Sequence, residues 1–334
     1  MAKNRTRATI KSVARQAGVS VATVSRVING HSGITAARRD AVLKAVRELD
    51  YRPSDTAREL SLGRVTRVGL NFGNGPLLMR SHTLLRDHLY AELFQRGLQV
   101  ETVASNSAGL PGFLPDALIV GSLFDDDPRL RYLSSENVPV VLHGHREGFF
   151  SVTSDDYEGG RLAANHLLEL GHERIAFLTG GTNRRQYTPL SYYTMISHDR
   201  FRGFRDALAA RGIGFDPAAM LDGGYEPLAS FRAVRDALQS GLSFTAIFAL
   251  SDEMAYGAMQ ALVEAGKQVP RDVSIVGFDD MPGFGDHITT IRQDVGALAH
   301  NIADLLTQAV EGRPPVQRII PVQLVTRGTT MRVC

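Results

Sequence analysis

The chain has 334 residues, 43% of them hydrophobic and 22% charged, which is typical of a soluble globular protein with one small and one larger domain. Its one cysteine is Cys334, so an internal disulfide and a cysteine-rich metal site are excluded. Residues 1–67 hold 14 Lys or Arg and 5 Asp or Glu, a net charge of +9, and since the whole chain carries +2, the rest carries −7. We therefore expect the first segment to bind a polyanion and, because it lacks the apolar core of a signal peptide or membrane span, the protein to be cytoplasmic.

The first predicted element is a pair of short helices in residues 9–30, TIKSVARQAGVSVATVSRVING. Thr9 caps the first helix, Gly18 permits a tight turn and Ser20 caps the second helix. Apolar residues at one-turn spacing form the inward face: Ile10, Val13, Ala14, Ala17, Val24, Val27 and Ile28. This pattern predicts a helix-turn-helix, whose second helix enters the major groove of DNA. The residues left to contact DNA are Val21, Ala22, Ser25, Arg26 and Asn29.

Arg26 is the strongest candidate among these for base recognition, because a guanidinium donates two hydrogen bonds to guanine O6 and N7. Val21 and Ala22 offer apolar contact to a thymine methyl group. The alternative is an ordinary helical hairpin whose polar residues are only solvated. The local positive charge favours the DNA-binding interpretation.

A third helix is predicted over residues 36–49 and completes a three-helix headpiece. In the following segment, YRPSDTAREL at residues 51–60, Pro53 ends that helix and Ser54 or Asp55 caps one more short turn. Fewer than two helical turns are not stable alone in water. From the residues alone, a short helix and a plain linker remain equal alternatives.

After this segment the pattern changes to short apolar runs that alternate with helix-like stretches. The predicted strands lie at residues 67–72, 99–104, 115–120, 139–142, 174–178, 246–249 and 273–278. This alternation is typical of an α/β protein with parallel sheets. In open sheets of this kind, ligands bind at the carboxyl ends of the strands.

The residues resemble the lactose-repressor (LacI) family of bacterial transcription regulators over nearly the whole chain. The resemblance is carried by AGVSVATVSRVING and YRP…AREL in the first part and by LGHERIAFLTG and DVSIVGFDD in the second. It implies an α/β fold with a helix-turn-helix headpiece at residues 8–52, a hinge helix and linker at 53–63, and a periplasmic-binding-protein-like core at 66–331. The core is expected to form two parallel-sheet lobes, lobe 1 at about 66–153 and 287–313 and lobe 2 at about 154–286 and 314–331.

The family resemblance also implies how the hinge segment acts. In the family this helix orders when two subunits pair on the operator, and its leucine inserts into the minor groove; here that leucine is Leu60, supported by Ala57. Inserting an apolar side chain costs a few kcal/mol of base unstacking but lets a kinked duplex contact more protein. We therefore expect a homodimer on double-stranded DNA with a pseudo-palindromic operator.

Five residues are expected, by the same resemblance, at a small-molecule effector in the crevice between the lobes. They are Arg200 in DRFRGF, Asp279 in GFDD, Tyr225 in GGYEP, Asp155 before GG, and Arg146 after PVVLHGH. Each has a structural alternative: Asp279 as a loop cap, Arg200 as the partner of a surface carboxylate, and Tyr225 as a core residue. An aromatic face at Tyr225 suits either a pyranose or a flat base.

The chain departs from the family pattern at three places. Residues 105–114, with two glycines and a proline, stand where family members carry a full helix, so the first lobe is expected to lack one element. Residues 181–198 form a longer insert with three tyrosines, which is a solvated flap, a lid or a dimer contact. Ser251 stands where relatives often have Asn, which removes an amide from the crevice.

The sequence thus predicts a repressor of carbohydrate-utilisation genes controlled by a small-molecule effector, with a sugar as the first choice. The alternatives are a nucleobase co-repressor, or a ligand-free dimer that keeps the core only as a scaffold. Enzyme activity is not expected, because motifs of phosphate loops, zinc proteases and serine or cysteine nucleophiles are missing. No cofactor and no metal are expected; His143 and His145 lie two residues apart, a spacing more typical of a loop than of a metal site.

Overall fold

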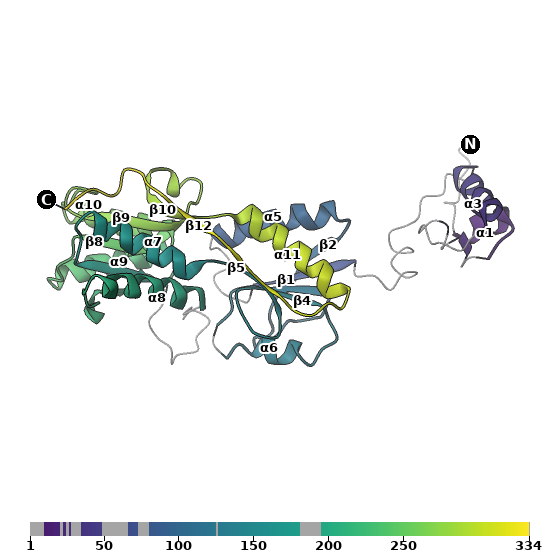
Figure 1. Cartoon of the computed structure of the whole chain (residues 1–334), viewed down its shortest axis with the longest axis horizontal. Helices are drawn as coiled ribbons and strands as arrows, with labels where there is room; N and C mark the ends of the chain where they lie inside the picture. The colour runs from purple at the N-terminus through teal and green to yellow at the C-terminus, as the bar shows by residue number, and fades with distance from the viewer. Residues whose placement is uncertain are drawn as a thin grey trace, which may run out of the picture. The chain divides into compact units, whose positions relative to one another are not determined.

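The protein is described by a computed structural model, in which residues 10–20, 23–24, 27, 35–48, 66–72, 80–124, 126–180 and 195–333 are placed. The chain divides into two compact units, Met1–Thr66 and Arg67–Cys334 (Figure 1). Over the placed residues, none of the helices has the length and apolar character needed to cross a membrane.

The first unit confirms the helix pattern of the headpiece wherever its residues are described. It contains α1 (Ile10–Ala17) and α3 (Ala36–Glu48). Gly18 follows α1 with a φ of 63°, a left-handed conformation that favours glycine. The hydroxyl of Ser20 accepts a hydrogen bond from the Thr23 backbone N–H at 3.1 Å, as expected for a helix cap. The buried core consists of Val13, Ala14, Val24, Val27, Val42 and Ala45.

The second unit contains two lobes, each built on one six-stranded sheet. All strands of the first sheet run parallel, in the order β11-β5-β4-β3-β1-β2. Their bounds are β1 (Arg67–Asn71), β2 (Gln99–Thr102), β3 (Ala117–Val120), β4 (Val140–His143), β5 (Phe150–Ser154) and β11 (Gln317–Ile320). Helices α5 (Arg80–Gln95) and α11 (Val295–Val310) pack together on one face, and α6 (Pro128–Leu133) lies on the other (Figure 1).

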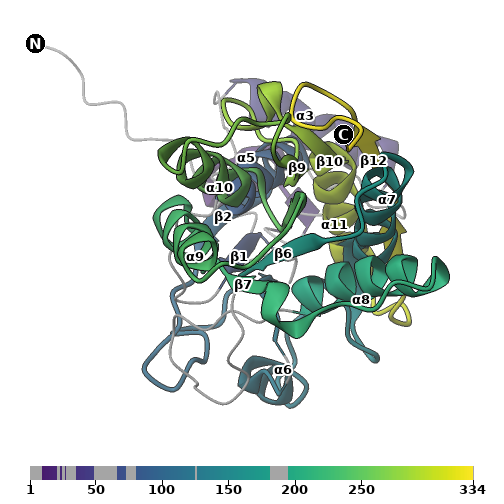
Figure 2. The same ribbon diagram turned by 90° about the vertical axis from the view of Figure 1, so that its left-hand side faces the viewer.

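The second sheet has the order β12-β10-β9-β8-β6-β7 and is parallel except for its β10–β12 pair. Its strands are β6 (Ile175–Thr179), β7 (Met220–Asp222), β8 (Ala246–Ala249), β9 (Ser274–Asp279), β10 (Thr289–Gln293) and β12 (Val322–Val325). Two helix pairs cover its faces, α7 (Asp156–Glu169) with α8 (Met195–Ala210), and α9 (Pro227–Gln239) with α10 (Asp252–Glu264) (Figure 2). The short 3-10 helices are η1 (Pro217–Ala219) and η2 (Gly285–His287).

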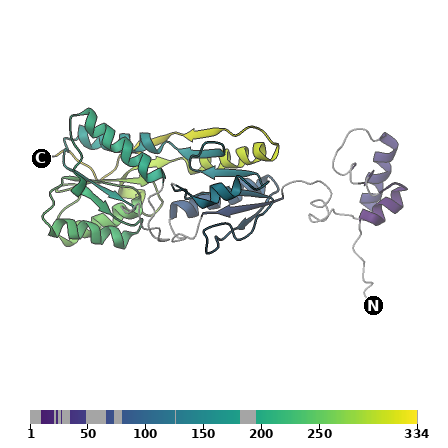
Figure 3. The same cartoon turned by 90° about the horizontal axis from the view of Figure 1, so that it is seen from below.

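The lobe boundaries predicted from sequence are wrong at two points near the end of the chain. Residues 287–313 were expected in the first lobe, but β10 pairs with β9 and β12 and belongs to the second sheet. Residues 314–331 were expected in the second lobe, but β11 pairs with β5 in the first sheet. The chain therefore crosses between β10 and α11 and returns between β11 and β12, as Figure 3 shows. Apolar periodicity identifies a strand but carries no information on which sheet it joins.

The first lobe lacks a helix between β2 and β3, as predicted. Residues 103–116 form a loop closed by a single bridge between Ser105 and Pro111. The side chain of Asn106 stabilises this loop by accepting hydrogen bonds from the backbone N–H groups of Ala108 and Leu110, at 2.9 and 3.1 Å. Of the predicted insert, residues 181–194 lie outside the described residues, and α8 begins directly after them.

Glycines let α7 and α8 approach each other closely. A Cβ on Gly160 of α7 would lie 2.0 Å from the carbonyl oxygen of Arg200, and a Cβ on Gly203 of α8 would lie 1.9 Å from that of Tyr157. Both obstacles are backbone atoms, which cannot move aside as a flexible side chain can. The separation of the two helices therefore depends on these two residues having no side chain.

We expect Gly160→Ala to destabilise the core, because the added methyl group forces α7 and α8 apart. Overpacking of this kind costs about 1 to 3 kcal/mol or more, which outweighs the gain of up to about 1 kcal/mol in helix propensity. Urea unfolding measures the difference. Gly296→Ala in α11 is the matched control, since its Cβ would meet only ordinary contacts at 3.5 Å or beyond. Equal free energies of unfolding for the two variants would contradict the close-approach argument.

Candidate functional site

Arg200, on α8, is the centre of the polar groups at the carboxyl ends of the second sheet. Its side chain is buried, and its Nε donates a hydrogen bond to Oδ1 of Asp156 at 2.8 Å. Its Nη1 donates to the carbonyl oxygen of Leu250 at 2.7 Å, and the guanidinium carbon lies 3.4 Å from the ring centroid of Phe278. Burial lowers the pKa of Arg200, but the charges of Asp156 and Asp279 outweigh it, and the net shift is upward. The guanidinium is therefore charged and fixed in place.

Asp279 ends β9 and faces Arg200. Its Oδ1 lies 3.9 Å from Nη1 of Arg200 and accepts a hydrogen bond from Nε2 of Gln293 at 2.6 Å. Its φ is 103°, a conformation that L-residues rarely adopt and that often marks functional positions. Burial raises the pKa of Asp279 to about 8, although the charge of Arg200 acts in the opposite direction. This carboxyl group can therefore act as a hydrogen-bond donor or acceptor near neutral pH.

Two segments that cross between the lobes are tied to this carboxyl group. Gln293, where the chain leaves the second sheet, accepts a hydrogen bond at Oε1 from the hydroxyl of Ser154 at 2.6 Å. Ser154 ends β5, where the chain leaves the first sheet. Close by, Thr153 donates from Oγ1 to Oδ2 of Asp156 at 3.2 Å. The groups around Arg200 are thus bonded directly to the connections between the lobes.

Asp252, at the start of α10, holds the turn that follows Asp279. Its Oδ1 accepts a hydrogen bond from the hydroxyl of Thr290, and its Oδ2 accepts one from the N–H of Met281, both at 2.7 Å. The turn includes Asp280 with a φ of 58°. Burial raises the pKa of Asp252 to about 7. A fully buried carboxyl group that anchors a strained turn fixes the direction of Asp279.

Two imidazoles of the first lobe face the same charges. Burial, together with the charge of Arg200, lowers the pKa of His82 to about 4. Burial, followed by the charges of His82 and Arg200, lowers the pKa of His143 to about 3. The ring of Phe72 lies 5.6 Å from that of His82 and 6.5 Å from that of His143, measured between centroids. The two imidazoles and Phe72 thus form an aromatic cluster in the first lobe whose histidines are neutral at physiological pH.

The structure brings together two of the five predicted effector residues, Arg200 and Asp279, and places a third beside them. Tyr225 is buried in the second lobe, and its hydroxyl is hydrogen-bonded to that of Ser197 on α8, the helix that carries Arg200. A Cβ on Gly180 would collide with its ring, so one face of the ring packs inside the lobe. The position expected to stack on a ligand is therefore also a core position.

Asp155 and Arg146 lie in other environments than the sequence suggested. Oδ1 of Asp155 accepts a hydrogen bond from the N–H of Glu158 at 3.0 Å and caps α7, and it is the next residue, Asp156, that pairs with Arg200. Arg146 is half-buried, and its Nε has no hydrogen-bond partner within the described part of the chain.

The predicted DNA contacts all lie outside the described residues: Val21, Ala22, Ser25, Arg26, Asn29, Ala57 and Leu60.

Sequence reasoning missed Asp156, Gln293 and the two imidazoles. His143 carried the clearest signal, since it ends a predicted strand at the edge of the sheet where ligands bind. His82 lies in α5, several residues beyond the end of β1, and gave no signal. Gln293 was assigned to the wrong lobe, which concealed its contact with Asp279.

The raised pKa values predict that stability decreases as the pH rises from 6.5 toward 8. The folded protein keeps protons on Asp252 and Asp279 up to about pH 7 and 8, whereas the unfolded chain, with an ordinary value of 3.8, has already lost them. The buried histidines, whose ordinary pKa is 6.5, contribute little to the pH dependence of stability above that pH. Asp279→Asn should therefore reduce the fall in melting temperature over this range. Asp87→Asn, at an exposed carboxylate of α5, should keep the wild-type slope, and equal slopes for both variants would contradict the prediction.

Comparisons with known proteins agree with this architecture. Residues 9–54 match the family described as bacterial regulatory proteins, lacI family, and residues 164–330 match the periplasmic binding protein-like domain. The HTH-type transcriptional regulator CelR of Thermobifida fusca is 31% identical, covering 97% of this chain and 99% of the relative. The lactose operon repressor of Escherichia coli (strain K12) is 30% identical, covering 97% and 91%. The transcriptional repressor PurR of Haemophilus influenzae (strain ATCC 51907 / DSM 11121 / KW20 / Rd) is 30% identical, covering 98% and 99%.

Solved structures show the same likeness. The lac repressor dimer bound to operator and the anti-inducer ONPF aligns with a TM-score of 0.77 and 28% identity, covering 98% of this chain and all of that one. The complex of CelR with cellobiose aligns with a TM-score of 0.68 and 28% identity, covering 97% and 100%. These relatives are transcriptional regulators and not enzymes. From its headpiece to its two-lobed core, the chain belongs to the lacI family of bacterial regulatory proteins and is a DNA-binding transcriptional regulator.

Proposed function

We propose that the protein represses transcription by binding a pseudo-palindromic operator as a homodimer, and that a sugar held by the core controls this binding. The observation that carries the proposal is the contact between Asp279, which faces Arg200, and Gln293 at a connection between the lobes. A ligand that hydrogen-bonds to Asp279 acts on a carboxyl group that is itself hydrogen-bonded to Gln293, at the point where the chain crosses between the lobes. Such a regulator acts in the cytoplasm, where the bacterial chromosome lies.

A sugar fits the polar groups of the site. Its hydroxyl groups match carboxyl groups and neutral imidazoles, which accept and donate single hydrogen bonds. Its apolar C–H face matches an aromatic ring such as that of Phe72. The complex of the relative CelR with cellobiose and the ligand-bound lac repressor support this ligand class for a core of the same fold.

Dimerisation is supported by apolar surface on the second lobe. Leu228 on α9 and Tyr256 and Val263 on α10 are large, apolar and exposed, with 43% to 65% of their surfaces accessible. Exposed apolar residues that lie on neighbouring helices often mark protein interfaces. A dimer also supplies two headpieces for the two halves of an operator, and the solved lac repressor on its operator is a dimer.

A nucleobase co-repressor is the second candidate for the effector. It is favoured by one observation, the 30% identity to the repressor PurR over 98% of this chain. The third possibility, a core that has lost its ligand, rests on the helix missing between β2 and β3. The buried ion pair of Arg200 and Asp156, with the carboxyl group of Asp279 beside it, argues against it, since a scaffold has no need of such a costly cluster.

Leu60→Ala should weaken operator binding strongly and leave the stability of the core unchanged, because the variant loses the side chain expected to insert between base pairs. The measurement is fluorescence anisotropy on an operator selected from genomic fragments by the wild-type protein. Val333→Ala, at an exposed apolar residue of the second unit, controls for a general loss of apolar surface. An unchanged affinity of Leu60→Ala for the operator would contradict the hinge assignment.

The effector site is tested by thermal unfolding with a panel of sugars, sugar phosphates, nucleobases and amino acids. A ligand that binds only the folded protein, at a hundredfold excess over its Kd, adds about 2.7 kcal/mol of stability. We expect one class to raise the melting temperature of the wild-type protein and of Asp87→Asn but not of Asp279→Asn. If no compound in the panel has an effect, the ligand-free scaffold becomes the better account.

A further inference from the structure

The loop of residues 103–116, which stands in place of a helix between β2 and β3, contacts β1 along the whole length of that strand. β1 is the strand that follows the headpiece, since the second unit of the chain begins at its first residue, Arg67. Its five residues span about 13 Å at the rise of a parallel strand. The contacts between loop and strand therefore reach from the amino end of the first sheet to its carboxyl end.

At the amino end, the last residue of the loop holds the start of β1. Oδ2 of Asp116 accepts a hydrogen bond from the backbone N–H of Arg67 at 2.9 Å, and Oδ1 lies 3.4 Å from Nη2 of the same arginine. The two side chains are 32% and 50% exposed, so their ion pair contributes little. The bond to the backbone N–H is the one that fixes the path of the chain, because it does not depend on the rotamer of Arg67.

In the middle of β1, the loop packs directly on the backbone of the strand. A Cβ on Gly69 would lie 2.5 Å from Cγ2 of Val103 and 2.6 Å from Cγ of Pro115. These two buried residues come from opposite ends of the loop. A strand residue without a side chain thus lets the loop lie against the sheet where the helix is missing.

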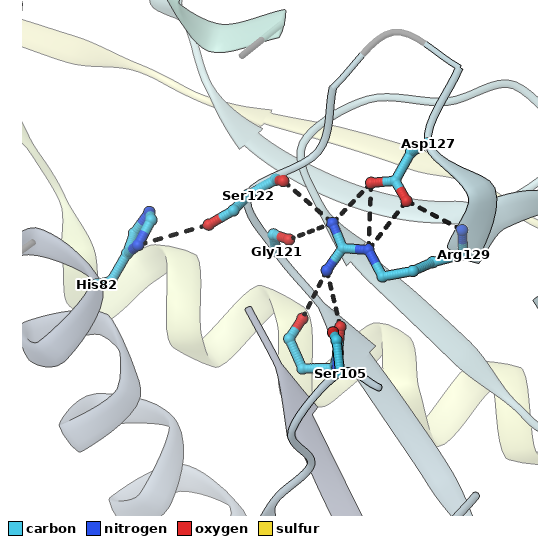
Figure 4. Close-up of polar contacts among 7 residues, drawn as sticks. His82, Ser105, Gly121, Ser122, Asp127 and Arg129 are labelled. Carbon is cyan, nitrogen blue, oxygen red and sulfur yellow. Dashed lines mark hydrogen bonds and ion pairs between the residues drawn. The ribbon is translucent and has the colours of Figure 1, made fainter. Parts of the chain in front are cut away.

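At the carboxyl end, a buried ion pair fixes the other part of the loop. Arg129 of α6 is fully buried, and its Nη2 lies 2.6 Å from Oδ2 of Asp127 (Figure 4). Its Nη1 donates to the side-chain oxygen of Asn71, the last residue of β1, at 2.7 Å. Nδ2 of Asn71 in turn donates to the carbonyl oxygen of Val103 and the hydroxyl of Ser105, at 2.8 and 3.1 Å. The amide of Asn71 is therefore held by Arg129, and it holds the loop.

The position of the first core residue matters for DNA binding because two headpieces must reach one operator. Once one headpiece of a dimer is bound, binding of the second is intramolecular, with an effective concentration set by the length and stiffness of the connecting chain. A chain that leaves the core from a fixed point has fewer arrangements to lose on binding than one that leaves from a loose point. Fixing Arg67 therefore raises the affinity for a full operator without any new contact with DNA.

We propose that the 103–116 loop is a brace that fixes the point where the chain leaves the core toward the headpiece, with Asp116 as its positioning residue. Asp116 acts through the N–H of Arg67 and not through contact with DNA. Because Asn71 and Arg129 hold the other end of the brace, changes at the carboxyl end of β1 also affect DNA binding. The proposal rests on the proposed function, since it takes the operator-bound protein to be a dimer, and it needs no particular effector.

The test compares two duplexes of equal length, an operator selected from genomic fragments by the wild-type protein and the same duplex with one half-site scrambled. Asp116→Ala should weaken binding of the full-length protein to the full operator about tenfold, by loss of one charge-assisted hydrogen bond. Its affinity for the half-operator should be unchanged, because a single headpiece needs no fixed exit. Asp116→Asn, whose amide oxygen still accepts from the N–H of Arg67, should keep both affinities. Fluorescence anisotropy well below the melting temperature of each variant measures them.

Glu311→Ala is the matched control, because it removes another partly exposed carboxylate that is paired with an arginine, at the end of α11 in the same lobe. It should keep the wild-type ratio of the two affinities. An equal loss on both duplexes in Asp116→Ala, or no loss on either, overturns the proposal; a lower melting temperature with unchanged affinity would leave Asp116 with a structural role only. If the wild-type protein binds both duplexes equally, the dimer of the proposed function is itself wrong.

The other end of the brace is tested by Ser105→Ala, which removes one hydrogen bond from Asn71 and leaves the bond between Asp116 and Arg67 in place. We expect binding to the full operator to weaken about threefold, by loss of one neutral hydrogen bond, and binding to the half-operator to stay unchanged. Combined with Asp116→Ala, it should cause no further loss, because both variants act on one brace. Additive losses, or wild-type affinity of Ser105→Ala for the full operator, overturn the proposal. This variant decides alone if Asp116→Ala does not fold.

Discussion

The pairing of Arg200 with Asp156 is the interaction on which the geometry of the core depends. A buried guanidinium is tolerated only with a partner and further hydrogen bonds, which Asp156 and the carbonyl of Leu250 supply. The pair forms because α7 and α8 approach to backbone contact at Gly160 and Gly203. The two glycines make no contact with the ion pair through a side chain, but the close approach of the helices that they permit is required for the pair to form.

Sequence reasoning identified the local structure well because that structure depends on nearby residues. The cap at Ser20, the turn at Gly18 and the missing helix between β2 and β3 each follow from a short motif and were predicted correctly. The partner of Arg200 was not predicted correctly, since Asp155 and Asp156 are adjacent residues of the same type that differ only in the direction of their side chains. The first caps α7 and the second points to α8, a distinction set by helix packing.

The pair of Arg129 and Asp127 was also beyond sequence reasoning, because its partners come from three separate segments. Asn71, which accepts a hydrogen bond from Arg129, donates from Nδ2 to the carbonyl of Val103 and to the hydroxyl of Ser105 in the loop that replaces the helix. This polar network ties the loop to the end of β1 and to α6, and such networks specify one arrangement because each unpaired member is costly.

The three crossings between the lobes are bonded to one another, so a displacement of one crossing strains its bonds to the others. Ser154 bonds to Gln293, and the N–H of Asp155 donates to the carbonyl of Ile320, so the first crossing is tied to the second and the third. Gln293 in turn donates to Asp279. In the proposed effector site, a ligand hydroxyl at Asp279 would therefore bond to the same carboxyl group as Gln293. Because coupling between binding sites is reciprocal, an effector that changes the affinity for DNA has its own affinity changed by DNA to the same degree.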